Sequence, residues 1–258
     1  MTLKIPSNLK QGLPFFFSVA SGDVQGVNFV KKFGNNPSIS SETETIWDGG
    51  GMYEYLQNGQ ILSVASESGN DSISGSGART VEVQGLDNEF YELSQTVELD
   101  GQNPVELQES MSRVFRVRVL TAGSSAFNEG NINVGFGSFS SGVPSNLLAS
   151  VQSEKNQTQM ALYTVPSGKV AFLCDYYNNV GEGKTAQVES YARSQGGVFQ
   201  LKRIVNGFEN SFFFPNSFPF FFDEKTDIEI RANSSSAGAS VSAGFDMMIV
   251  EKGKSWGF

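Results

Sequence analysis

The feature that most constrains the fold is a repeated alternation of polar and apolar residues in short segments that end at turn residues. Residues 79–84 and 91–99 alternate in this way, so each would place one face in a core and the other in solvent. Asp100 and Gly101 follow the second segment as a turn. Roughly fourteen such segments occur at the spacing typical of a β-sandwich or barrel. The sequence therefore predicts an all-β protein.

Two Asn-Gly pairs predict tight hairpins, because this dipeptide adopts the turn that matches the twist of paired strands. The pairs are Asn58-Gly59 and Asn206-Gly207. They separate the strand candidates 52–56 from 60–65 and 198–205 from 208–214. The strongest helix candidate, residues 145–151, is short.

Many antiparallel strands and few helices favour a jelly-roll-like double-sheet sandwich. We expect this sandwich to span residues 42–258, since no clear linker divides that stretch. Residues 1–41 are predicted to form an extended N-terminal arm, because the prolines at positions 6, 14 and 37 interrupt any helix. Residues 15–17 could form a short buried strand within this arm.

Phenylalanine is the most informative residue type, with 22 copies in the chain. Consecutive side chains of a strand point to opposite faces, so a run of three cannot bury every ring in one sheet interface. Either the rings fill a thick core within the chain, or they form a subunit interface. Pro215, Asn216 and Pro219 are predicted to bend residues 212–222 into an aromatic loop. The predicted aromatic interface residues are Phe15, Phe16, Phe17, Phe212, Phe213, Phe214, Phe218, Phe220, Phe221 and Phe222.

Charge is unevenly distributed along a chain whose formal net charge is -9. Residues 42–109 hold fourteen acidic residues and one basic residue, whereas the arm holds four lysines against Asp23 alone. A net negative field does not attract nucleic acid or anionic lipid, so neither is expected as a partner. The acidic segment and the basic arm could both be ordinary solvated surface. Alternatively, the basic arm could dock on an acidic neighbour. The lysines that would do so are Lys4, Lys10, Lys31 and Lys32.

The chain contains no histidine and one cysteine, which excludes most enzyme classes. Histidine is the side chain best suited to proton exchange near neutral pH, and without it no Ser-His-Asp or Cys-His arrangement can form. Cys174 lies in an apolar run and is expected to be a buried core thiol. No catalytic residue, metal or cofactor is predicted. Hydrolysis by two carboxylates remains an alternative, and residues 70–72 could contribute oxygens to calcium although no calcium motif surrounds them.

Several short motifs resemble a family of virion structural proteins of marine tailed bacteriophages. They span residues 44–250 in order, and each is rich in turn residues. The motifs are Glu44-Thr45-Ile46-Trp47 with Gly50 and Tyr53, Gly77-Ala78-Arg79-Thr80-Val81, Gly85-Leu86-Asp87, residues 161–169, Glu224-Lys225-Thr226-Asp227-Ile228 and Val241-Ser242-Ala243-Gly244-Phe245. The resemblance implies a particle component and supplies no catalytic residues.

These observations predict a non-enzymatic virion protein, a head decoration or cement subunit that forms a homo-oligomer, expected to be a trimer, and binds other virion proteins such as the major capsid protein. Because a single cysteine allows no intrachain disulfide, which fits a reducing compartment, and the N-terminus does not resemble a signal peptide, we expect synthesis in the host cytoplasm. The alternative is a receptor- or glycan-binding tail or fibre module. Its stacking faces would come from Trp47, Tyr53, Tyr55, Tyr91, Tyr176 and Tyr177.

Overall fold

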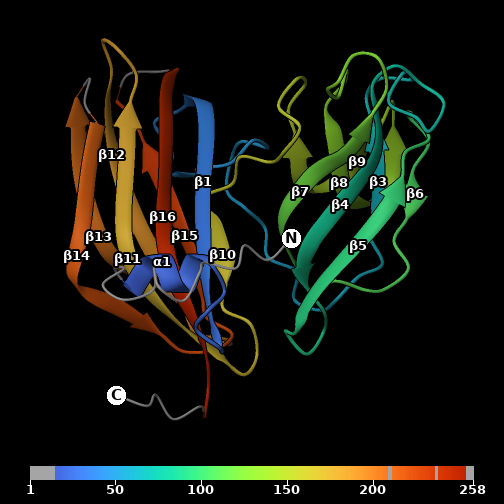
Figure 1. The fold of residues 1–258 in the computed structure, drawn as a ribbon. Coiled ribbons are helices and arrows are strands. Elements are labelled where there is room, and N and C mark those ends of the chain that lie inside the picture. Colours follow the sequence, from blue (N-terminus) through green and yellow to red (C-terminus); the bar gives the residue numbers. More distant parts are fainter. Residues whose placement is uncertain (1–14, 209–210, 236–237, 254–258) are drawn as a thin grey trace.

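The computed structural model describes residues 15–208, 211–235 and 238–253, which form sixteen strands and one helix. The strands build four small sheets in which every pairing between strands is antiparallel. Figure 1 shows them as two lobes of two sheets each. The prediction of an all-β fold is confirmed. A jelly roll is not confirmed, because the strands are divided among four sheets.

The first lobe, here called the terminal lobe, contains both ends of the described chain. Its sheet 1 has the order β1 (Val27–Ile39), β16 (Ala239–Glu251), β11 (Lys169–Val180) and β14 (Ser211–Phe222). Its sheet 2 has the order β10 (Leu162–Thr164), β15 (Asp227–Asn233), β12 (Thr185–Arg193) and β13 (Gln200–Phe208), with β2 (Glu44–Thr45) paired to β15. The facing sides of the two sheets share one core, which includes Tyr176 and Phe245 from sheet 1 and Val188 and Ile230 from sheet 2.

The second lobe, here called the central lobe, is built from the middle of the chain. Sheet 3 has the order β6 (Val105–Glu106), β3 (Ser63–Ser66), β8 (Ile132–Ser140) and β9 (Val143–Val151). Sheet 4 has the order β5 (Glu92–Glu98), β4 (Ala78–Leu86) and β7 (Arg113–Ala122). Valines from both sheets fill its core, among them Val64, Val134, Val81 and Val117.

The predicted boundary at residue 41 does not coincide with the division between the lobes. Residues 27–39 form β1, which pairs with β16 as a full member of sheet 1. Phe15–Ala20 is the helix α1 and not a strand, and its Val19 packs against Val27 and Val250. Lys4 and Lys10 lie outside the described residues. No helix in the described part of the chain is long and apolar enough to cross a membrane.

Three local predictions are wrong because tertiary pairing overrides local preference. The predicted helix over residues 145–151 lies in β9, which is hydrogen-bonded to β8. Asn206 and Gly207 lie inside β13 opposite β12, while β14 belongs to the other sheet, so no hairpin joins β13 to β14. The hairpin predicted at Asn58-Gly59 does not form either, because the residues around Asn58 form no β-ladder. Gln60 makes an isolated bridge to Met111.

The segment 212–222 is a strand and not a loop. β14 is the edge strand of sheet 1, where proline is tolerated because one side of the strand needs no ladder hydrogen bonds. Pro215 lies opposite Asp175 and Phe220 lies opposite Leu173, so residues 216–219 have only one residue across from them. This bulge projects Phe218 from the sheet edge with 93% of its surface exposed.

Two segments that connect the lobes pass against β1. The segment that leaves the terminal lobe contains Ile46, and the segment that returns to it contains Ala161. Ala161 donates a backbone hydrogen bond of 2.9 Å to Ile46, which joins the outgoing and returning segments. Gly34 lies directly against them, because a Cβ placed there would be 2.2 Å from the Ile46 oxygen and 2.4 Å from the Ala161 nitrogen. Only a residue without a side chain fits this crossing.

We therefore expect Gly34→Ala to lower the free energy of unfolding by about 1–3 kcal/mol, the usual cost of overpacking. Urea unfolding followed by tryptophan fluorescence would measure it. Gly69→Ala is the matched control, since no atom lies within 4 Å of a Cβ at that position. Equal stability of the two variants would contradict this reading of the crossing.

Candidate functional site

Two rows of side chains cross the outer face of sheet 1, the face turned away from sheet 2. The strand register places the members of each row side by side on neighbouring strands. The first row is Phe29, Met248, Phe172 and Phe221, and the second is Phe33, Gly244, Tyr177 and Phe213. The Phe172 and Phe221 rings meet edge to face with centroids 5.5 Å apart. We call this surface the aromatic face.

A polar row separates the two aromatic rows. Lys31 on β1 forms an ion pair of 2.7 Å with Asp246 on β16. Asp175 lies opposite Asp246 on β11. Burial raises the pKa of the Asp175 carboxyl, and the negative charge of Asp246 raises it further. The row thus carries one positive and two negative groups within an apolar surround.

The phenylalanine runs alternate about the plane of β14, as strand geometry requires. Phe214, Phe220 and Phe222 turn inward to the core of the terminal lobe. Phe213 and Phe221 turn outward and are 65% and 57% exposed. The runs therefore supply both a core and an exposed surface, and neither sequence interpretation alone accounts for all the rings.

Helix α1 packs on one end of the aromatic face, where Phe29, Phe172 and Met248 of the first row adjoin the cluster around Val19. It crosses the lower end of the sheet in Figure 1, where Val19 contacts residues of β1 and β16. Phe15, Phe16 and Phe17 lie in its first turn and are 43%, 58% and 59% exposed. The predicted Phe15–Phe17 cluster and the outward residues of β14 thus belong to the same side of the terminal lobe.

Lys32 does not reach any surface, although it was predicted to contact a partner. It points inward from β1, is 3% exposed, and donates a hydrogen bond to the Phe115 carbonyl of the central lobe. Burial holds the pKa of its ammonium group well below the usual value, and the nearby positive charge of Arg116 lowers it further. Lys32 therefore joins the lobes and is not available for docking.

Lys32→Met should be as stable as the natural chain or about 1–2 kcal/mol more stable at pH 7, because burying an ammonium group is costly. The unfolded chain keeps this proton up to the ordinary pKa of 10.5, whereas the folded chain loses it at lower pH. The natural chain should therefore gain stability as pH rises toward 10.5, and the advantage of the variant should shrink. Urea unfolding at pH 7, 9 and 10 measures this; a constant difference would contradict it.

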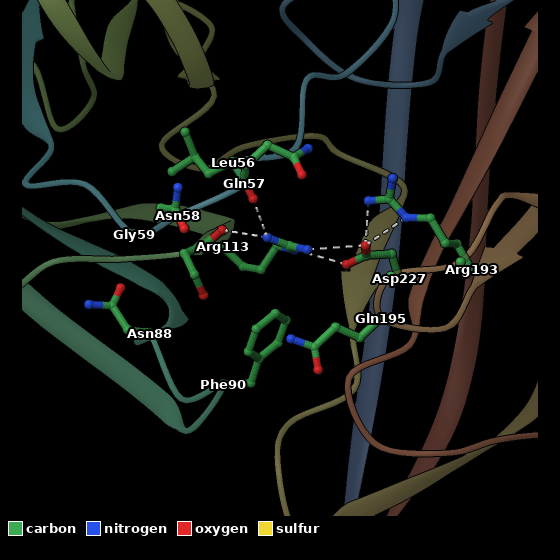
Figure 2. A pocket seen from close by; sticks show the side chains of 13 residues that line it. Leu56, Gln57, Asn58, Gly59, Asn88, Phe90, Arg113, Arg193, Gln195 and Asp227 are labelled. Atoms are coloured by element: carbon green, nitrogen blue, oxygen red, sulfur yellow. Dashed lines mark hydrogen bonds and ion pairs between the residues drawn. The ribbon is translucent and has the colours of Figure 1, made fainter.

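Asp227 and two arginines form a buried ionic junction between the lobes (Figure 2). Arg113 of β7 donates to Asp227 through Nε at 2.8 Å and Nη2 at 3.2 Å. Arg193 of β12 binds the same carboxylate through Nη2 at 2.6 Å. Thr164 adds a hydroxyl donor at 2.7 Å, and Asp227 is 1% exposed. These contacts hold the start of β7 against sheet 2.

Aromatic rings and a second ion pair enclose this junction. The Arg113 and Arg193 guanidinium groups lie 5.1 Å and 4.7 Å from the Tyr55 ring centroid. The Tyr55 hydroxyl donates to Glu229 at 2.8 Å, and Glu229 also pairs with Arg231. Burial raises the pKa of the Glu229 carboxyl, while Arg231 opposes that rise. Sequence reasoning missed this cluster, because its members are far apart along the chain.

Asp227→Ala should lower the free energy of unfolding by about 3–5 kcal/mol, since it leaves two arginines without their shared carboxylate in a buried site. Lys31→Ala is the control. It breaks an exposed ion pair, for which a loss below about 1 kcal/mol is expected. Chemical denaturation would compare the two variants. Equal losses would show that the junction contributes no more than a surface pair.

The structure also gives the positions of the other tyrosine, cysteine and acidic residues that were singled out from the sequence. Tyr53 and Tyr176 are buried, which removes them as sugar-stacking faces, whereas Tyr91 is exposed. Cys174 is half-buried.

The Asp71 carboxylate accepts hydrogen bonds from the Ser66 hydroxyl and from three backbone amides, and so organises its loops. Within the described ranges, no group of three or more acidic or cysteine side chains is arranged to hold a metal ion.

No family model matches the sequence, and no curated protein matches it. Among solved structures, an infectious bursal disease virus Gt strain structure aligns over 94% of this chain and 79% of its own, with 12% identity and a TM-score of 0.25. The crystal structure of the infectious bursal disease virus VP2 subviral particle aligns over 94% and 78%, with 9% identity and a TM-score of 0.24. TM-scores of this size do not establish a shared fold.

Proposed function

We propose that this chain is a non-enzymatic structural subunit that assembles with copies of itself through the aromatic face. The observation that carries the proposal is the pair of aromatic rows that end in exposed Phe213 and Phe221 on the edge strand β14. Exposed large apolar side chains that gather on one face of a soluble protein mark interaction sites. Aromatic side chains also dominate the energetics of protein interfaces.

A second copy of the chain is the partner that best fits this face. A two-fold contact joins the same patch on both subunits, so the patch must be complementary to itself. The aromatic face meets this requirement, because its apolar rows flank a polar row with Lys31, Asp175 and Asp246. In such a contact Lys31 of one copy would compensate the carboxylates of the other. In an assembly of higher symmetry, such as the predicted trimer, the edge strand β14 would form an additional contact between copies.

The proposed setting is the virion of a tailed bacteriophage. This part of the proposal is supported by the resemblance of the motifs between residues 44 and 250 to virion structural proteins. A head decoration or cement subunit that contacts the major capsid protein would use one face for self-association and leave others for the shell. Incorporation of the tagged chain into purified particles would test the setting separately from self-association.

The triple variant Phe213→Ser, Phe218→Ser and Phe221→Ser should convert the oligomer into a folded monomer. These rings point outward, so their loss removes apolar contact area between copies and leaves the core in place. Size-exclusion chromatography with light scattering gives the mass, and circular dichroism confirms the fold. An oligomer of unchanged mass would refute the proposal.

The matched control is the triple variant Ile61→Ser, Ile73→Ser and Leu120→Ser in and beside the central lobe. These three side chains are also exposed, at 47%, 50% and 44%. The control removes comparable apolar surface away from the aromatic face. It should keep the mass of the natural oligomer; monomer formation by both variants would show that the effect is not specific to β14.

A further inference from the structure

A cavity lies beside the ionic junction, and its lining points to a function that does not depend on assembly. It has a volume of about 570 Å³, within the range of sites for small ligands. The central lobe contributes Asn88, Phe90 and Arg113, and the terminal lobe contributes Arg193 and Gln195. Both lobes are therefore needed to form it.

We propose that this cavity binds a carboxylated sugar. The charged residues of its lining are Arg113, Arg193 and Asp227, two positive and one negative, in a chain of net charge -9. The site thus carries a local excess of positive charge that favours an anion. Guanidinium groups also match the planar geometry of a carboxylate.

Arg193 has the donors that such a carboxylate requires. Its Nε and Nη2 both bind Asp227 Oδ2, at 3.2 Å and 2.6 Å. Its Nη1 makes no hydrogen bond within the described part of the chain. Arg113 is more fully used, because its Nη1 donates to the carbonyls of Leu56 and Ser112. Arg193 is therefore the residue expected to contact the carboxylate.

The rest of the lining favours a polyhydroxylated ligand over a simple anion. Four amide side chains and one hydroxyl surround the cavity, and these groups can donate to and accept from sugar hydroxyls. Figure 2 shows the Gln195 amide directed toward Phe90, with Gln57 and Asn58 on the opposite side of Arg113. The polar residues are Gln57, Asn58, Asn88, Ser112 and Gln195.

Two of these amides are not used to hold the fold. The side chains of Asn58 and Gln195 make no hydrogen bond among the residues that the structure describes, and Gln195 is exposed. A ligand can therefore engage them without breaking an existing contact. This distinguishes them from Asn88, whose amide donates to Ser110 at 2.9 Å.

The wall of the cavity contains backbone strain that the surrounding contacts maintain. Phe90 has a φ of 70°, a conformation that is costly for a bulky side chain. The centroid of its ring lies 5.0 Å from the Arg113 guanidinium and 5.5 Å from the Lys225 ammonium. Its carbonyl accepts a hydrogen bond of 2.7 Å from Ser167. Strain of this kind clusters at ligand sites, where it fixes the geometry of a wall.

Isothermal titration of the full chain with glucuronate and galacturonate, and with glucose and galactose as neutral counterparts, tests the proposal. We expect either uronate to bind at least about tenfold more tightly than its neutral counterpart, because a charged hydrogen bond is gained. A panel in which acidic and neutral sugars bind equally, or in which none binds, would overturn the proposal. So would inorganic phosphate competing as well as the uronates, since it would show a general anion site.

Variants then assign the binding to this cavity. The double variant Asn58→Ala and Gln195→Ala should weaken uronate binding about tenfold with the melting temperature unchanged. Gln102→Ala, which removes an exposed amide of the central lobe, should bind as the natural chain does. Arg193→Gln should reduce the preference for the acidic sugar more than the binding of the neutral one. Natural affinity in the double variant would overturn the assignment.

Titration with an oligogalacturonate distinguishes two sources of the sugar acid, a free or chain-terminal residue and an internal residue of a glycan. Tighter binding of the monosaccharide supports a free or chain-terminal residue, and tighter binding of the oligomer supports an internal residue of an acidic glycan. Both outcomes agree with the proposal and differ only in the presentation of the ligand. Failure of both arms would overturn it and would leave the assembly proposal untouched.

Discussion

The contact of Asp227 with Arg113 and Arg193 is the interaction on which the relation between the lobes depends. Asp227 begins β15 in sheet 2, and Arg113 begins β7 in sheet 4. Because all three charges are largely removed from water, separating the lobes at this point would leave at least one of them without compensation. The same contact forms part of the cavity lining, so the shape of that cavity is tied to the way the lobes are joined.

The terminal lobe is assembled from strands that are distant in sequence, and this explains its two faces. β1 pairs with β16 across more than two hundred residues, and β11 lies between β16 and β14. Only this pairing places Phe29, Met248, Phe172 and Phe221 in one row. The inward residues of the same strands close the core, while their outward residues form the aromatic face. A single set of strands thereby supplies both stability and the proposed contact surface.

Part of this structure follows from local patterns and part does not. Alternation predicted strands over residues 79–84 and 91–99, which are found in β4 and β5. The phenylalanine runs predicted that not every ring could be buried in one sheet interface, and Phe213 and Phe221 are indeed exposed on the other face of β14. The Asn206-Gly207 pair predicted a hairpin that does not form, because β13 pairs with β12 and β14 pairs with β11. Alternation reports which residues share a face of a strand and does not report which strands are neighbours.

The sequence by itself determined the β class, since short alternating segments with turn residues between them cannot form long amphipathic helices. It also determined that these 258 residues supply no imidazole group for proton transfer, because they include no histidine. The tertiary structure alone decided the division into two lobes, the inward direction of Lys32 and the meeting of Arg113 with Asp227. These depend on contacts between residues about eighty to more than a hundred positions apart, and such contacts leave no periodic signal in the chain. The cavity between the lobes exists for the same reason, and so could not be located from the sequence.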